Sequence, residues 1–323
     1  MPRRIIAAIA TGVAAGGMLL GVGPASADLV TYCIGTGGAV TVPNDLYVPA
    51  DESCDLTGTI ITGNVSVAAG ANLVVSGGRV SGDVRVAGNG YFDASSSVVS
   101  GQVVLAAGGY GVYLREAQSG SITVRPKGAT TVDSFLFVED STVAGGVTAG
   151  AGDVRIDRNS QVEGNVNSSG TYYTDVHDSF VDGTLSVLNS ATGSVVCGSA
   201  VRGKTTFAGN LGGVQLGPNG GLDSCASGGY FGRDVSITNT TGGVTVDDNI
   251  IDGVLTAQSN NPAAVVAPNN RIRGGIVGDT GAAVARKGTS MTPPDRENRA
   301  ESRASARRTS AAAEAEAAGP AHL

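Results

Sequence analysis

The chain has 323 residues and a formal net charge of −7 at neutral pH, and this acidic balance argues against nucleic acid as a partner. Hydrophobic residues make up 41%, which excludes wholesale disorder, and the 50 glycines follow no Gly-X-Y period, which excludes collagen. Aromatic residues make up only 4% and tryptophan is absent, so the core must be built from small and β-branched side chains.

Residues 1–27 are typical of a secretory signal peptide. Two arginines precede an apolar run, and the segment ends in Ala25-Ser26-Ala27, the small-x-small pattern that signal peptidase cleaves. The apolar run is short and contains several glycines, which argues against a membrane anchor. We therefore expect a protein that is secreted or held at the cell surface, with no membrane contact after the signal is removed.

Residues 28–58 are predicted to be an N-terminal cap that covers the exposed edge of the first repeat. They contain two of the four cysteines, and an even set of cysteines in an exported chain predicts disulfides. We favour the pairs Cys33–Cys54 and Cys197–Cys225, because each joins near neighbours and closes one local loop. A zinc site built on these cysteines would need a CxxC motif or a nearby histidine pair, and the chain has neither.

Residues 59–284 contain a repeated phrase anchored on glycine. The first four anchors, Gly63, Gly82, Gly101 and Gly120, are each 19 residues apart, and most later gaps are 19 to 21 residues. The gaps before Gly145 and Gly232 are longer and predict enlarged coils or loops. Such a period is too short for a helix with its loops and predicts short strands that stack coil upon coil. The anchors are Gly63, Gly82, Gly101, Gly120, Gly145, Gly164, Gly183, Gly203, Gly232, Gly253 and Gly274.

Valine, isoleucine or leucine stands two residues before and two residues after most anchors, which is the alternation of a strand with one buried face. Four residues before the anchor stands a serine or asparagine, whose side chain tolerates turns and can hydrogen-bond along the axis of the coil. We therefore expect an all-β, right-handed parallel β-helix of about 10–12 coils. The Ser/Asn column comprises Ser97, Ser141, Ser160, Ser179, Ser199, Asn249 and Asn270.

Residues 285–323 lack the apolar periodicity of the preceding coils. They are rich in arginine, alanine and glutamate, a composition that predicts a disordered tail. Any helix in the protein is expected to be confined to this segment.

The valine ladders and the Ser/Asn column resemble the right-handed parallel β-helix of the pectate-lyase-like superfamily. The Val-x-Gly-x-Val-x-Val coils are also similar to the shorter coils of bactofilin-type polymer-forming proteins. The run from Val42 to Gly77 resembles the opening of exported actinobacterial β-helix proteins of unassigned function. The resemblance covers roughly residues 40–278, and it implies a fold more than an activity.

Three sets of residues are candidates for a functional site. Polar positions around the main strand form a hydroxyl and amide face that suits an extracellular polysaccharide, with ligand-binding candidates Tyr172, Tyr173, Asn165, Asn167, Thr184 and Ser186. Stacked oxygen ligands at one turn position predict a calcium site at Asp140, Asn159 and Asp178. A catalytic alternative uses Asp175, His177, Asp178 and Asp182.

The resemblance implies that a uronate lyase would combine calcium-binding aspartates with a basic arginine or lysine, and that a glycosidase would use clustered aspartates. No arginine stands beside the Asp140/Asp178 column in an obvious way, and the charged residues fall largely at turns. We therefore favour a non-catalytic scaffold or binding protein for glycan or cell wall, with no cofactor other than calcium. The alternatives are a polysaccharide-degrading lyase or glycoside hydrolase on the acidic middle coils, and a self-assembling structural protein.

Overall fold

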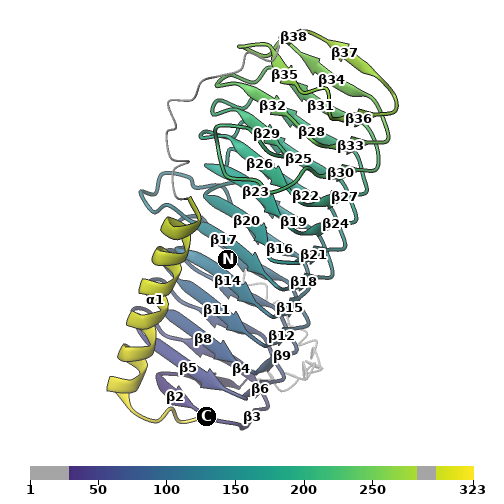
Figure 1. Ribbon diagram of the computed structural model, residues 1–323. Coiled ribbons are helices and arrows are strands. Elements are labelled where there is room, and N and C mark those ends of the chain that lie inside the picture. Colours follow the sequence, from purple (N-terminus) through teal and green to yellow (C-terminus); the bar gives the residue numbers. More distant parts are fainter. Residues whose placement is uncertain (1–28, 282–295) are drawn as a thin grey trace, which may run out of the picture.

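The computed structural model describes residues 29–281 and 296–323. Residues 29–281 coil into a parallel β-solenoid of about 12 turns, as Figure 1 shows, so the predicted fold class is confirmed. Each coil contributes one strand to each of three parallel sheets, named here A, B and C. The expected signal segment, 1–27, lies outside the described residues.

The strands pair in chain order within each sheet. Sheet A contains β1 (Val30–Tyr32), β4 (Asp45–Val48), β7 (Val65–Val67), β10 (Val84–Val86), β13 (Val103–Leu105), β16 (Ile122–Val124), β19 (Val147–Ala149), β22 (Val166–Ser169), β25 (Leu185–Leu188), β28 (Thr205–Ala208), β31 (Val235–Thr238), β34 (Leu255–Gln258) and β37 (Ile276–Gly278). Sheet B contains β2 (Gly35–Gly37), β5 (Ser53–Thr57), β8 (Asn72–Ser76), β11 (Tyr91–Ser95), β14 (Gly111–Arg115), β17 (Phe135–Glu139), β20 (Asp153–Asp157), β23 (Tyr173–His177), β26 (Ser194–Cys197), β29 (Val214–Leu216), β32 (Val244–Val246), β35 (Ala264–Val266) and β38 (Thr280–Gly281). Sheet C contains β3 (Thr41–Val42), β6 (Ile60–Ile61), β9 (Arg79–Val80), β12 (Val98–Val99), β15 (Gln118–Ser119), β18 (Thr142–Val143), β21 (Gln161–Val162), β24 (Phe180–Val181), β27 (Ala200–Val201), β30 (Tyr230–Phe231), β33 (Ile250–Ile251) and β36 (Arg271–Ile272).

The repeated Val-x-Gly-x-Val phrase is a corner between two sheets and not one continuous strand. Val80 ends β9 in sheet C, Val84 begins β10 in sheet A, and Gly82 lies between them. The backbone N–H of Gly101 donates to the carbonyl of Gly82 at 3.2 Å, and a Cβ on Gly101 would lie 2.4 Å from that oxygen. The glycine recurs because successive backbones approach too closely at this corner for any side chain.

The Ser/Asn column stacks along the axis of the solenoid as predicted. The Ser160 hydroxyl accepts a hydrogen bond from the backbone N–H of Ser141, one coil earlier, and Ser179 does the same for Ser160, both at 3.2 Å. Asn270 continues the pattern by accepting from the N–H of Asn249 at 2.9 Å. These side chains accept hydrogen bonds from turn amides that have no partner within a strand, and Ser160 and Ser179 are buried.

The interior of the solenoid is a continuous ladder of valine, leucine and isoleucine. Val65 and Val67 of β7, for example, are fully buried and lie in register with Val84 and Val86 of β10. Because the inner residues stack on like residues of the next coil, small β-branched side chains fill most of the narrow core. Three fully buried phenylalanines, Phe92, Phe207 and Phe231, also belong to it.

Residues 28–58 were expected to cap the solenoid, but they contain five strands, β1 to β5, that belong to the three sheets. β4 pairs with β7 and β5 with β8 in parallel register, so this segment builds the first coils. The residues after α1 cover part of their edge: Thr36 of β2 donates from its backbone N–H to Gly319 O at 2.9 Å and accepts from Ala321 N–H at 2.8 Å.

The expectation that 285–323 is disordered is corrected for the part that the structure describes. Helix α1 (Arg296–Ala318) lies along the outer face of sheet B over the first half of the solenoid (Figure 1). Ala304, Ala311 and Ala315 are buried on that face. An isolated helix of this polar composition is marginal in water, so its stability comes from this docking. Residues 285–295 lie outside the described ranges.

Both predicted disulfides, Cys33–Cys54 and Cys197–Cys225, are confirmed. The first joins the beginning of the chain to β5, and the second joins the end of β26 to the long loop between β29 and β30. Within the described ranges, no helix is both long enough and apolar enough to span a membrane.

Candidate functional site

A row of seven hydroxyl and amide side chains runs along the outer face of sheet A. Each of its members stands directly opposite the next in the strand register, and in each strand the residues on either side of the member are buried. Adjacent members are therefore one strand spacing apart, about 4.8 Å. We call this row the polar ladder: Thr123, Thr148, Asn167, Ser186, Thr206, Ser236 and Thr256.

The first four members of the polar ladder line a shallow depression of about 380 Å³. Pro126 and Leu188 form part of its wall and add an apolar surface beside the hydroxyls. The predicted residues Asn167 and Ser186 lie in this depression. Asn165 and Thr184 lie at the corner beside it, where Asn165 Oδ1 accepts hydrogen bonds from the backbone N–H of Thr184 at 2.8 Å and from its hydroxyl at 3.0 Å.

The two tyrosines of the predicted ligand site do not join these four residues. Tyr172 is exposed in the turn between β22 and β23, and Tyr173 is buried on the outer face of sheet B. The structure therefore brings together four of the six predicted residues and separates the tyrosines, because β23 belongs to a different sheet from β22.

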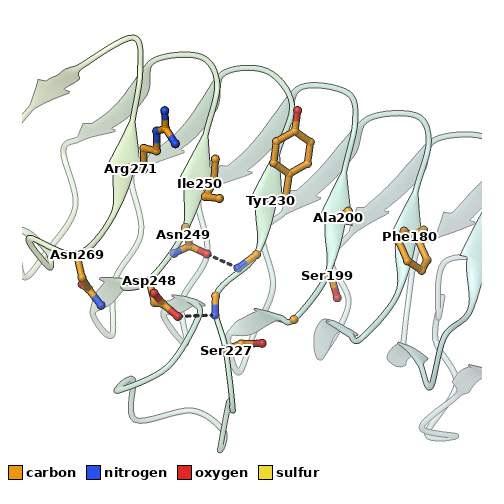
Figure 2. Close-up of a pocket in the computed structure, with 13 residues that line it drawn as sticks. Phe180, Ser199, Ala200, Ser227, Tyr230, Asp248, Asn249, Ile250, Asn269 and Arg271 are labelled. Atoms are coloured by element: carbon orange, nitrogen blue, oxygen red, sulfur yellow. Dashed lines mark hydrogen bonds between the residues drawn. The ribbon is translucent and has the colours of Figure 1, made fainter.

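A second depression, of about 420 Å³, lies on the outer side of sheet C and was not predicted. Figure 2 shows the row Phe180, Ala200, Tyr230, Ile250 and Arg271, whose members are opposite one another in register. Phe180 and Tyr230 are 46% and 40% exposed. The sequence signal was a large side chain directly before the core-facing residue in four of these five strands, namely Phe180, Tyr230, Ile250 and Arg271.

Polar groups border the sheet C row. The Tyr230 hydroxyl donates to Asp252 Oδ2 at 2.7 Å, and this hydrogen bond raises the pKa of Tyr230. On the other side, Asp248 and Asn249 hold the chain of the long loop by accepting hydrogen bonds from the backbone N–H groups of Gly228 and Gly229, as Figure 2 shows. These contacts fix the rim of the depression.

The four residues of the predicted catalytic alternative lie at different places in the fold. Asp175 and His177 share the outer face of β23, where Asp175 stands opposite Arg155. Asp178 lies in the following left-handed turn, and Asp182 lies at the next corner, where it pairs with Arg202 at 2.9 Å. The four side chains therefore do not form one cluster.

Asp223 is the partner of His177 that sequence reasoning missed. His177 Nε2 lies 3.4 Å from Asp223 Oδ2, and Asp223 comes from the long loop between β29 and β30. The unusually long gap before Gly232 was the only sequence signal for this loop.

The three residues of the predicted calcium column lie at left-handed turn positions. Asp140, Asn159 and Asp178 have φ angles of 45°, 62° and 45°. Asn159 follows a second left-handed residue, Arg158, so this turn holds one residue more than its neighbours. In the described part of the chain, three histidine or carboxylate side chains converge at a different place, namely at Asp175, His177 and Asp223.

A further charged cluster lies beneath α1. The Tyr91 hydroxyl donates to Asp93 Oδ2 at 2.6 Å, and burial raises the pKa of Asp93 to about 6. The Tyr113 hydroxyl donates to Glu139 Oε2 at 2.8 Å, and burial raises the pKa of both groups. Arginines of α1 cover this surface, with Arg308 2.9 Å from Asp93 Oδ1, so the cluster is part of the helix interface.

Comparisons with protein-family models, with curated proteins and with solved structures find no match for this chain. Functional inference therefore rests on the surfaces described above.

Proposed function

We propose that the protein is a secreted or cell-surface β-helix that binds an extended extracellular glycan along the polar ladder. The observation that carries the proposal is the unbroken register of seven hydroxyl and amide side chains over a flat strand face. A spacing of about 4.8 Å is close to the length of one sugar residue in an extended chain, so successive rungs can hydrogen-bond successive sugars.

Export is the second part of the proposal. The two disulfides support an oxidising compartment. The signal-like segment at residues 1–27 and the resemblance to exported actinobacterial β-helix proteins point the same way. Sedimentation of the protein with cell-wall fractions, compared with its amount in the culture medium, separates wall attachment from free secretion.

The depression at Thr148, Asn167 and Ser186 is the predicted centre of binding, because there the ladder is joined by an apolar wall. We expect the triple variant Thr148→Val, Asn167→Ala, Ser186→Ala to lower retention on an insoluble polysaccharide by about tenfold or more, since each lost hydrogen bond is worth about 0.5–1.5 kcal/mol. The measurement is affinity sedimentation against cellulose, chitin and peptidoglycan.

Two matched controls lie on the other sheets. Tyr173→Ala, Asp175→Ala, His177→Ala changes sheet B, and Phe180→Ala, Tyr230→Ala changes the sheet C row. Both are expected to keep the retention of the wild type. Loss of retention only in the sheet C variant would move the binding face there and refute the polar ladder.

The same proteins and polysaccharides, assayed for released sugars, test the enzymatic alternative. We expect no release of reducing-end or unsaturated sugars by the wild type, because the acidic groups of the middle coils are dispersed over turns and corners. Turnover that the sheet B variant abolishes would establish a polysaccharide-degrading enzyme instead, since general acid and base groups supply about 10²- to 10⁴-fold each.

A further inference from the structure

We propose that Asp175, His177 and Asp223 form a binding site for one divalent transition-metal ion, of which Zn²⁺ is the best match. Each residue offers one ligand atom, and the three atoms all lie within 4.8 Å of one another. This site lies on sheet B and is independent of the proposed glycan face on sheet A.

The strand geometry places the first two ligands. Asp175 and His177 are two residues apart on β23, so both side chains project from its outer face. Asp175 is buried, and its Oδ1 accepts a hydrogen bond from the backbone N–H of Val195 at 3.0 Å, which orients the carboxylate.

The long loop delivers the third ligand, and two separate contacts hold this loop against sheet B. Gln215 Oε1 accepts hydrogen bonds from the N–H groups of Leu222 and Asp223 at 2.9 and 3.2 Å, and Gln215 Nε2 donates to the Asp223 carbonyl at 2.8 Å. The Cys197–Cys225 disulfide fixes the loop two residues further on, and Cys197 stands opposite His177 in the next strand. The fold therefore positions Asp223 before any metal binds.

The donor set fits a borderline divalent ion. One imidazole nitrogen and two carboxylates suit Zn²⁺ and its neighbours in the first transition series, whereas Ca²⁺ takes oxygen ligands only. Tetrahedral bonds of 2.0–2.2 Å separate neighbouring ligand atoms by about 3.4 Å. His177 Nε2 and Asp223 Oδ2 are already 3.4 Å apart.

The charges and the access to solvent also agree. Two carboxylates balance a divalent charge. The neighbouring cation, Arg155, stands opposite Asp175 in register and also donates from its Nε to Asp157 Oδ2 at 3.0 Å. The His177 and Asp223 side chains are 13% and 20% exposed, so an ion can enter, and three protein ligands leave a fourth position for water.

The test is calorimetric titration of the tag-free, disulfide-intact mature protein with Zn²⁺ after treatment with a chelator. We expect one ion per chain, with affinity at least tenfold weaker in His177→Gln and in Asp223→Asn. The matched controls are His322→Gln, which removes the only other histidine, and Asp182→Asn, which removes a carboxylate paired elsewhere. Both controls are expected to bind like the wild type.

A second measurement guards against variants that merely disturb the loop. Co²⁺ added to the wild type should broaden the NMR signals of the His177 imidazole and leave those of His322 sharp. No binding at millimolar Zn²⁺, unchanged binding in His177→Gln, or equal broadening of both histidines would each overturn the site.

Discussion

The guanidinium of Arg308 lies 2.9 Å from Asp93 Oδ1 and joins the last helix of the chain to β11, one of its early strands. The Asp93 side chain is fully buried, and Arg308 provides the positive charge that faces this carboxylate from α1. Arg303 makes a second such contact, to Asp153 of β20 at 2.9 Å. The docking of α1 therefore combines these ion pairs with its buried alanines and with hydrogen bonds that Arg307 donates and Glu314 accepts.

The first prediction concerns these anchors. Arg308→Ala should weaken the docking of α1 by about 1–3 kcal/mol, because it removes the nearest cation from a buried carboxylate that keeps only the Tyr91 hydroxyl and the more distant Arg115. Hydrogen exchange of residues 301–318 measures the effect as faster exchange. The control is Arg299→Ala, since Arg299 is exposed on the same helix. Equal exchange in the two variants would show that the ion pair does not hold the helix.

The second prediction is a pH dependence. Burial raises the pKa of Asp93 to about 6 from its ordinary value of 3.8, so the folded state binds this proton more tightly than the unfolded state. The resulting stabilisation is present below about pH 4 and is lost as the pH rises through 6. Relative to Asp93→Asn, the wild type should therefore lose stability between pH 4 and pH 7.

The amplitude of this loss should be about 3 kcal/mol at most, the equivalent of the pKa difference, which already includes the opposing effects of the Tyr91 hydrogen bond and of Arg115. Chemical denaturation of both proteins at several pH values gives the comparison. A difference that stays constant from pH 4 to pH 7 would contradict an elevated pKa at Asp93.

The third prediction concerns the glycine corners. Gly101→Ala should destabilise the solenoid by about 1–3 kcal/mol, because the new Cβ would lie 2.4 Å from the Gly82 carbonyl oxygen. Gly38→Ala is the matched control, since a Cβ there meets no described atom within 4 Å. Urea denaturation followed by circular dichroism measures both, and similar midpoints would refute the steric account of the repeat.

The fourth prediction concerns the Ser/Asn column. Ser160→Ala removes a fully buried hydroxyl that accepts from Ser141 N–H and lies 2.6 Å from the Asp157 carbonyl. We expect a loss of about 1–3 kcal/mol, the cost of an unsatisfied buried amide. Ser66→Ala on the partly exposed face of β7 should change stability by less than about 0.5 kcal/mol under the same denaturant titration.

Short-range features of the fold were predictable because each coil repeats the same local contacts. The 19-residue spacing of Gly63, Gly82 and Gly101 equals the length of one coil. The serine four residues before the anchor, as at Ser160, indicates the turn whose side chains stack from coil to coil. The disulfides followed from proximity along the chain. The repeat could not show that the anchor glycine separates a strand of sheet C from a strand of sheet A. The valines on the two sides of this corner are both buried, so their spacing looks like the alternation of one strand.

Long-range contacts escaped prediction for a different reason. Asp223 reaches His177 across a loop whose path is set by Gln215 and a disulfide, and neither has a local signature. The docking of α1 depends on arginines that match acids far earlier in the chain, so the segment alone has the composition of a disordered tail. The turn at Arg158 and Asn159 holds one extra residue. Counting back from the glycine anchors therefore misplaces β20 by one residue relative to β23.

Helix α1 packs along the axis of the solenoid, so the rise per residue of the helix can be compared with the spacing between coils. From Glu301, which pairs with Arg158 beside β20, to Gly319, which bonds Thr36 of β2, the helix rises about 27 Å at 1.5 Å per residue. The six strand spacings between β20 and β2 span about 29 Å. One coil thus equals about three helical residues, which is less than a full turn. Three more helical residues would match the added height of one coil and would turn the anchors by about 60° relative to the sheet. The spacing of the α1 anchors therefore matches the height of the coils that it covers, from β2 to β20.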